Sequence, residues 1–382
     1  MLLTEEQTMI REAARQYVAS EITPYAAKWD EQKTFPQKAL KGLAELGFYG
    51  MLVPEAYGGC DIGHVAAASV IEEIAFGDAA CSTVISVTNS VACMPILKFG
   101  DEFQKQTFLK PLASGQALGA FCLTEPQAGS DASDLKTKAV FHADAAGDYY
   151  VLNGVKQFIT SAKNADIAIV FAVTDPNAGK KGLSAFIVPV DTKGYEVTAI
   201  ENKMGQNASD TGQITFEDCK IPAIYRLGQE GEGYKIALSN LEGGRIGIAA
   251  QSVGIARAAF EASKNYAKER KTFGKSLVDH QVISFKLADM ATKIDAARLL
   301  YQRAAELRDH QLPCLKEASM AKLFASEMAE WVCSQAIQIH GGYGYLRDFP
   351  VEKYYRDVRV CQIYEGASEI QRLVIGRAVL ND

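Results

Sequence analysis

The stretch YYVLNGVKQFITSA, residues 149–162, opens a series of short β-rich segments in the middle of a chain whose pattern is otherwise helical. Four more segments follow, separated by Gly, Pro, Asn and Asp: ADIAIVFAVT (165–174), GLSAFIVPV (182–190), YEVTAI (195–200) and QITFEDCKIP (213–222). No helical pattern lies between them. This spacing predicts a compact antiparallel barrel or sandwich, because short turns join neighbouring antiparallel strands.

The residues before this region are helical in pattern. Thr4 and Gln7 match a capping box, and apolar residues from Met9 to Val18 recur at helical spacing. Gly and Pro cluster between the later segments. Further helices are predicted near 36–47, 64–78, 81–99 and 101–114.

Helical periodicity returns after about Gly233 in three long stretches, 237–271, 277–310 and 315–340, joined by short polar loops. Long helices with short connections predict an antiparallel bundle. The length of 382 residues fits two or three domains of roughly 150 residues each. We therefore expect an α+β protein with an N-terminal α-helical domain (1–120), a middle antiparallel β-barrel or sandwich domain (121–232) and a C-terminal four-helix bundle (233–382).

The charge balance and the N-terminus narrow the class of protein. Lys and Arg number 40 against 46 Asp and Glu, a net charge of −6, so we expect no nucleic-acid partner. The N-terminus is acidic at once and lacks the apolar core of a secretory signal, and we find no uncharged apolar stretch of about 18 residues. These features predict a cytoplasmic protein without membrane insertion.

The eight cysteines form no C-x-x-C pair and have no histidine pair nearby at metal-ligand spacing, so we expect no metal site. Cys122, Cys333 and Cys361 lie in apolar runs, which favours reduced, buried thiols over a disulfide framework.

The common nucleotide-binding fingerprints are missing. GEGYKI (231–236) and GYGYLR (342–347) each contain G-x-G but lack the third glycine of G-x-G-x-x-G, and there is no P-loop motif. A Rossmann oxidoreductase and a P-loop NTPase are therefore disfavoured.

Two polar stretches allow either a binding or a structural role. FCLTEPQAGSDASD (121–134) has small polar residues suited to binding an anion or a polar ring, or it is a turn between domains. ERKTFGKSLVDHQ (269–281) places Arg270, Thr272 and Phe273 between two long helices, where they either meet a pyrophosphate or form a solvated loop.

The segment LEGGRIGIAAQ (241–251) places Gly243 and Gly244 in a helix, where each glycine costs about 1 kcal/mol relative to alanine. This cost indicates either that another group approaches the backbone closely or that two helices pack through small residues. In the second case the neighbouring Arg245 is merely exposed.

Glu365 follows the apolar and aromatic run VCQIY and precedes Gly366. Burial among such neighbours would raise the pKa of its carboxyl group and make the carboxylate a stronger base. The alternative is a helix-start carboxylate, with Ser368 as the N-cap of the last helix.

Taken together, seven motifs resemble the acyl-CoA dehydrogenase family over essentially the whole chain, in its order and approximate spacing. They are TEPQAGSD, KMGQNASDT, LEGGRIGIAAQ, ERKTFGK, QIHGGYGY, RDVRV and IYEGASEIQR. The chain is most similar to short-chain, butyryl-type or short branched-chain members. The resemblance implies that tightly bound FAD oxidises a short- to medium-chain acyl-CoA, straight or branched, to the trans-2-enoyl-CoA and passes electrons to electron-transfer flavoprotein.

The resemblance also implies residue roles. Glu365 would remove the α-proton while flavin N5 accepts the β-hydride, and the place that supplies the base in some relatives is Gly244 here. FAD would contact Phe121, Leu123, Thr124, Ser130, Phe158, Ile159, Thr160, Arg270, Thr272, Phe273, Gln281, Gln338, Gly341, Gly342, Ala367, Ser368 and Glu369. The acyl-CoA would contact Ser130, Glu242, Arg245, Tyr364 and Gly366, with Glu242 alternatively capping a helix.

Three positions depart from the commonest family pattern: Ala367 replaces Thr, Phe158 replaces Trp, and His340 stands where some relatives are apolar. We expect His340 to be packed and not catalytic. The resemblance further implies a homotetramer, a dimer of dimers, in which Arg270 of a second chain meets the FAD pyrophosphate.

Two other classes remain alternatives at this stage. One is a catalytically idle member that binds flavin or acyl-CoA, and the other uses the fold for desulfination or decarboxylation of an acyl-CoA. Glu365 and Thr160 favour the dehydrogenase. Acyl chain length depends on the depth of a pocket and stays open.

Overall fold

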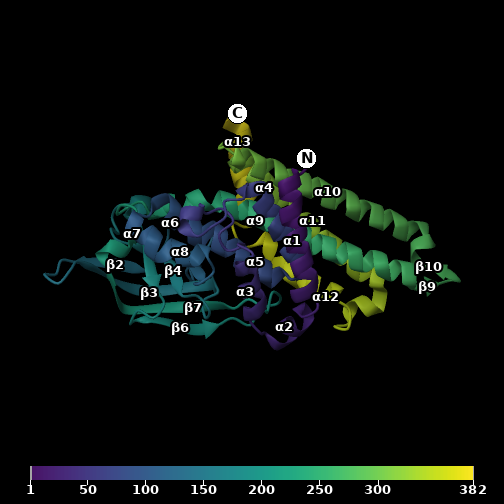
Figure 1. Cartoon of the computed structure of the whole chain (residues 1–382), viewed down its shortest axis with the longest axis horizontal. Coiled ribbons are helices and arrows are strands. Elements are labelled where there is room, and N and C mark those ends of the chain that lie inside the picture. Colours follow the sequence, from purple (N-terminus) through teal and green to yellow (C-terminus); the bar gives the residue numbers. More distant parts are fainter. Residues whose placement is uncertain (1, 382) are drawn as a thin grey trace.

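The computed structural model describes residues 2–381 and shows three parts in chain order. Figure 1 shows the strands of the large sheet gathered at one end of the molecule, the first helices of the N-terminal part in the middle, and long C-terminal helices extending to the other end. The α+β class and the helix, sheet, bundle order are confirmed.

The N-terminal part is helical as predicted. Its α-helices are α1 (Glu5–Glu21), α2 (Ala26–Gln32), α3 (Gln37–Glu45), α4 (Gly63–Gly77), α5 (Ala79–Val87), α6 (Met94–Phe99), α7 (Glu102–Gln104) and α8 (Lys110–Ala113). The Thr4–Gln7 capping box starts α1. Two one-turn π segments, Thr88–Cys93 and Lys105–Leu109, join α5 to α6 and α7 to α8.

By length and composition, Ala79–Phe99 is apolar enough to cross a membrane. The expectation that the chain has no apolar stretch of this length is therefore wrong. However, 83% of its most apolar window is buried inside the fold, as in the core helix of a compact domain.

The middle part is an eight-stranded sheet. Its strands are β1 (Gly119–Cys122), β2 (Lys138–His142), β3 (Tyr149–Thr160), β4 (Ile167–Val173), β5 (Leu183–Pro189), β6 (Tyr195–Ile200), β7 (Thr211–Pro222) and β8 (Arg226–Leu227). The order is β6-β7-β3-β2-β4-β5-β8, with β1 paired to β4.

The prediction of a purely antiparallel sheet is wrong in one respect. β1 runs parallel to β4, and β2 also meets β4 in parallel at Lys138 and Val173. Parallel neighbours need a long crossover. The β2–β3 hairpin supplies it here, because it lies between β1 and β4 in the chain.

Both faces of β4 are buried. Ile169 and Phe171 pack with helical residues such as Ile96 and Leu112 in one cluster. Val170 on the other face belongs to a second cluster with residues of β3 and β7. The central strands are therefore continuous apolar runs, as expected for strands covered on both sides.

The C-terminal part contains α9 (Gly233–Glu269), α10 (Gln281–Asp309), α11 (Leu315–His340), α12 (Val351–Val358) and α13 (Ser368–Asn381). The short hairpin β9 (Lys271–Thr272) and β10 (Lys275–Ser276) joins α9 to α10. Helix α9 packs against α11, α10 and α4. At Gly254 of α9 a Cβ would lie 2.3 Å from the Glu72 carbonyl of α4, so this glycine permits the close helix contact.

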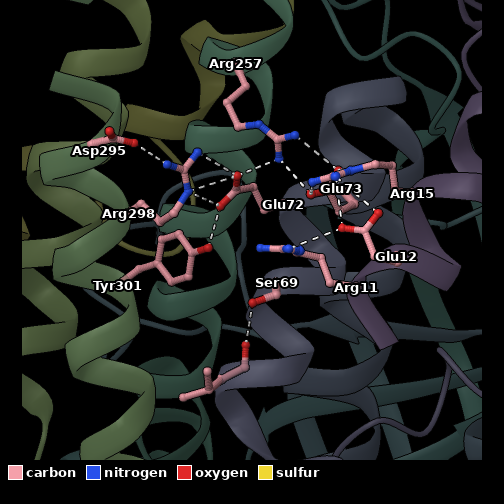
Figure 2. A network of polar contacts seen from close by, with 11 residues as sticks. Arg11, Glu12, Arg15, Ser69, Glu72, Glu73, Arg257, Asp295, Arg298 and Tyr301 are labelled. Carbon is pink, nitrogen blue, oxygen red and sulfur yellow. Dashed lines mark hydrogen bonds and ion pairs between the residues drawn. The ribbon is translucent and has the colours of Figure 1, made fainter. Parts of the chain in front are cut away.

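A charged network joins the N-terminal helices to the bundle (Figure 2). The buried carboxylates of Glu72 and Glu73 on α4 accept hydrogen bonds from Arg257 of α9. Glu72 also accepts from Arg298 of α10, and Glu73 accepts from Arg15 of α1. Four helices are thus held by one set of ion pairs, with a cavity of about 210 Å³ beside them.

All eight cysteines are free, and seven are buried. The prediction of reduced, buried thiols is therefore confirmed for all but Cys60, which is partly exposed.

Candidate active site

Glu365 lies in the turn that leads into α13. Both Glu365 and Gly366 have positive φ, 54° and 89°. The turn directs the Glu365 side chain toward α9, where a Cβ built on Gly244 would lie 2.5 Å from Oε2. The group that approaches Gly244 of α9 is therefore this carboxylate.

The Glu365 carboxylate has no hydrogen-bond partner among residues 2–381, and its Oε2 is shielded from solvent. Burial raises the pKa of the Glu365 carboxyl group to about 7, although the positive charges of Arg245 and Lys322 oppose the rise. A carboxylate without a partner is not a helix cap. The helix-start alternative for Glu365 is wrong, and Ser368 does not cap α13 either, because its buried Oγ also lacks a partner.

Arg245 is buried and not exposed. Its Nη1 donates to Ser319 Oγ of α11 at 3.2 Å, while Nε has no partner in the described chain. Burial lowers the pKa of Arg245, and the charges of Glu365 and Glu242 oppose this. Arg245 therefore brings a positive charge close to Glu365 without forming an ion pair with it.

Glu242 does not cap a helix, contrary to one of the two predictions for it. It lies in the interior of α9, which begins at Gly233, before the predicted start at 237. Its Oε2 instead accepts from Arg308 Nη1 of α10 at 2.7 Å.

Tyr364 ties the Glu365 turn to the sheet domain. Its hydroxyl donates to Gln251 Oε1 of α9 at 2.5 Å and accepts from Gln206 Nε2 at 3.3 Å. The backbone N–H of Gln206, in the KMGQNASDT segment, donates to Asp357 Oδ1 of α12. The Tyr364 hydroxyl therefore takes part in a buried hydrogen-bond network with Gln251 and Gln206.

The sheet domain brings the predicted flavin contacts from two segments together. The N–H of Gln157 donates to the Thr124 carbonyl at 2.9 Å, which fixes the 121–134 segment beside β3. Phe158 is 62% exposed with φ 58°, whereas Ile159 points into the sheet core. Among the remaining predicted contacts of this region, the structure leaves Phe121, Leu123, Thr124 and Thr160 partly exposed and Ser130 exposed.

A fully buried ion pair supports this arrangement. Lys156 of β3 donates to Glu125 Oε1 at 2.7 Å and to the Leu123 carbonyl at 3.1 Å. Glu125 also accepts from the backbone of Lys136 and Thr137. The pair fixes both ends of the polar loop that follows β1.

A second group of predicted contacts surrounds a cavity of about 410 Å³ at the other end of the bundle. Arg270, Thr272, Gly341 and Gly342 are among its lining residues. A Cβ at either glycine would have nothing within 4 Å, so the backbone there faces open space. His340 is packed, stacked on Tyr266 with ring centroids 4.2 Å apart, and burial lowers its pKa.

The two groups of predicted flavin contacts are not brought together within one chain. Figure 1 places the β9–β10 hairpin at the end of the molecule opposite the strands. Phe273 at the hairpin tip is 97% exposed, and Gln281 and Gln338 are also exposed. Near Glu365, Ala367 is partly exposed and Glu369 is exposed.

A small cavity of about 30 Å³ begins beside the glycine pair. Gly243 and Gly247 of α9 line it together with residues of the N-terminal helices. At Gly247 a Cβ would lie 2.5 Å from Ser86 Oγ, whereas at Gly243 it would have open space. Gly243 thus faces the cavity, whereas Gly244 faces the Glu365 carboxylate.

Sequence reasoning missed Lys322 and Gln371, which both contact the Glu365 turn. The sequence does contain a signal for Lys322, because its spacing places it on one helix face with Ala318 and Ala325, which are both buried. A lysine on a face of small buried residues is unusual. Gln371 carries no comparable signal.

Comparison with known proteins identifies relatives over the full length. Models described as the acyl-CoA dehydrogenase N-terminal, middle and C-terminal domains match residues 4–116, 120–219 and 231–380. The chain is 50% identical over 381 residues to a probable acyl-CoA dehydrogenase, YngJ, of Bacillus subtilis, covering 99% of both chains.

Two solved structures are similar over the whole chain. Butyryl-CoA dehydrogenase from Megasphaera elsdenii is 42% identical with a TM-score of 0.97, covering 100% of this chain and 99% of that one. A chain from a structure of the electron transferring flavoprotein of Acidaminococcus fermentans, concerned with flavin-based electron bifurcation, is 44% identical with a TM-score of 0.98, covering 100% of both.

Proposed function

This chain belongs to the acyl-CoA dehydrogenase family, and we propose that it oxidises a short-chain acyl-CoA to the trans-2-enoyl-CoA with Glu365 as the base. One observation carries the proposal: Oε2 of Glu365 is shielded from solvent and has no hydrogen-bond partner in the described chain, and burial raises the pKa of the carboxyl group to about 7. A base with a pKa near the operating pH combines a free lone pair with useful basicity.

The chain's own residues perform the proton transfer. The carboxylate of Glu365 takes the α-proton of the thioester, so the C–H electron pair becomes available to form the double bond. Arg245 and Lys322 keep part of the carboxyl population ionised despite burial. The glycine at 244 leaves the carboxylate room beside α9.

We propose FAD as the cofactor, and the residues present fit it. Thr124, Phe158 and Thr160 offer a partly exposed surface on the sheet domain, and Arg270 with the open backbone of Gly341 supplies a cationic cavity suited to a pyrophosphate. When bound, FAD supplies the hydride acceptor.

The separation of these two surfaces supports a composite site. Because the hairpin of Arg270 lies far from the sheet domain of its own chain, the second surface would come from a neighbouring chain. We propose a homotetramer, a dimer of dimers, in the cytoplasm. Similarity to a chain in an electron transferring flavoprotein structure supports such a flavoprotein as electron acceptor.

We propose a short acyl chain as the substrate. The resemblance to a butyryl-CoA dehydrogenase supports the same substrate class.

The test is anaerobic mixing of the holoprotein with butyryl-CoA, followed by flavin bleaching and product analysis. Native protein should bleach and form crotonyl-CoA, and Glu365→Gln should slow bleaching by about 100- to 10,000-fold while retaining FAD and acyl-CoA binding. Bleaching by Glu365→Gln at the native rate would place the base elsewhere.

Chain length is tested with the same assay on native protein. Butyryl-CoA should bleach the flavin faster than octanoyl-CoA. Equal rates, or a preference for octanoyl-CoA, would contradict the short-chain proposal, and a product other than the enoyl-CoA would contradict the dehydrogenase itself.

A further inference from the structure

We propose that Lys322 is a positioning residue for Glu365, holding the turn that carries the base and setting the charge around its carboxylate. This inference rests on the proposed role of Glu365. Lys322 itself is not catalytic, because its ammonium group contacts the turn and not the reacting atoms.

Lys322 reaches the turn from inside the bundle. It lies on the buried face of α11, and its side chain is 0% exposed. Its Nζ donates a hydrogen bond to the Gly366 carbonyl at 2.7 Å. Burying an ammonium group is costly unless it is hydrogen-bonded and matched by negative charge, so its placement here requires compensation.

The turn depends on contacts from outside itself. Glu365 is a non-glycine residue at φ 54°, a conformation that costs about 1 kcal/mol or more. Two side chains hold it: Lys322 at the Gly366 carbonyl, and Gln371, whose Nε2 donates to the carbonyls of Gly366 at 2.8 Å and Glu365 at 3.1 Å. Loss of either donor would let the turn relax and move the carboxylate away from Gly244.

Charge is the second part of the role. Two cations face Glu365, Arg245 from α9 and Lys322 from α11, and neither forms an ion pair with it in the described chain. Each therefore favours the ionised carboxylate without occupying its lone pairs.

The surroundings of Lys322 keep it charged at neutral pH. Burial, together with the charge of Arg245, lowers the pKa of Lys322 to about 8, and the negative groups Cys361, Glu365 and Glu327 limit the fall. Lys322 is thus mainly protonated over the pH range in which Glu365 titrates.

The charge and the hydrogen bond can be separated with two variants of the holoprotein. Lys322→Gln keeps a donor but removes the charge, and Lys322→Arg keeps the charge. The readouts are the pH profile of anaerobic flavin bleaching by butyryl-CoA and, independently of activity, the infrared titration of the Glu365 carboxyl group, assigned by its absence in Glu365→Gln.

We expect Lys322→Gln to move the bleaching midpoint and the infrared midpoint together to higher pH by about one unit, because an opposing charge is lost. Lys322→Arg should keep the native midpoint. Arg372→Gln is the matched control, since it removes a cation that pairs at the surface with Glu327 and does not touch the turn. The pH profile of flavin bleaching in Arg372→Gln should match that of the native protein.

A lysine with a purely structural role would lower the maximal bleaching rate without moving the midpoint of the pH profile. A native pH midpoint in Lys322→Gln would therefore overturn the proposal, even if the maximal rate fell. A shifted midpoint in Lys322→Arg would also overturn it. Should Lys322→Gln fail to fold, Lys322→Met serves with the same expected shift. Failure of the proposed function would instead appear as a native rate of flavin bleaching in Glu365→Gln. That result does not depend on the outcome of the Lys322 variants.

Discussion

The Glu365 carboxylate fills the space that a side chain at Gly244 would need: a Cβ at Gly244 would lie 2.5 Å from Oε2 and 2.9 Å from Cδ. The two residues are far apart in the chain and belong to α9 and to the turn before α13. The absence of a side chain at Gly244 therefore leaves the space that the Glu365 carboxylate occupies.

Gly244→Ala should displace this carboxylate and slow flavin bleaching by butyryl-CoA at least tenfold, with FAD still bound. The matched control is Gly376→Ala in α13, where a Cβ would have nothing within 4 Å. That change should leave bleaching unchanged and stabilise the fold by about 0.5 to 1 kcal/mol. Native bleaching rates in Gly244→Ala would show that Glu365 does not depend on this space.

The raised pKa of Glu365 should cost stability at neutral pH. An unfolded glutamate ionises near pH 4.5, whereas in the fold burial holds the proton up to about pH 7. The unfolded state therefore binds fewer protons between these values, and the free energy of unfolding falls as pH rises through that window.

Glu365→Gln removes this penalty. We expect a gain in the free energy of unfolding of about 1 to 3 kcal/mol at pH 8, shrinking to nothing below pH 4.5. Denaturant titrations of both proteins at these two pH values measure it. A gain of equal size at both values would mean that ionisation is not its cause.

The network of Figure 2 predicts a large loss of stability from one substitution. Glu72→Gln removes the buried carboxylate that Arg257 and Arg298 share, and breaking a buried ion pair typically costs about 3 to 5 kcal/mol. Arg257 keeps its pair with Glu73, and Arg298 keeps its pair with the exposed Asp295. The matched control is Glu261→Gln, which breaks an exposed pair with Lys264 on α9 and should cost less than about 1 kcal/mol.

The same substitution has a pH signature. Burial alone would raise the pKa of Glu72, but Arg257 and Arg298 lower it below its usual value of 4.5. The contribution of the Glu72 carboxylate to the free energy of unfolding is therefore present above pH 4.5 and is lost as pH falls below this value. The difference in thermal midpoint between native and Glu72→Gln should narrow in acid, and a constant difference would point to packing instead.

Arg270→Ala should weaken FAD retention and oligomer stability together, because the cavity of Arg270 would complete the site of a neighbouring chain. Lys275→Ala removes another cation from the same hairpin without lining this cavity and should change neither. Gel filtration with absorbance detection and analytical ultracentrifugation measure both properties. A fully flavinylated, active monomer would contradict the composite site.

The sequence by itself determined the features that depend on local spacing. Helical periodicity gave the long bundle helices, β-rich runs with turn residues gave the strands, and the Thr4–Gln7 pair gave the start of α1. The family motifs predicted Glu365 as the base, which stays a prediction. The glycine pair left two explanations open, a close approach to the backbone or helix packing through small residues.

Only the tertiary structure decided which distant groups meet. The parallel pairing of β1 with β4 depends on a crossover, and the approach of Glu365 to Gly244 depends on how a turn packs against α9. The raised pKa of Glu365 and the placement of Lys322 follow from burial. Burial and long-range contact are set by the packing of whole elements, whereas local spacing records only the conformation of each element.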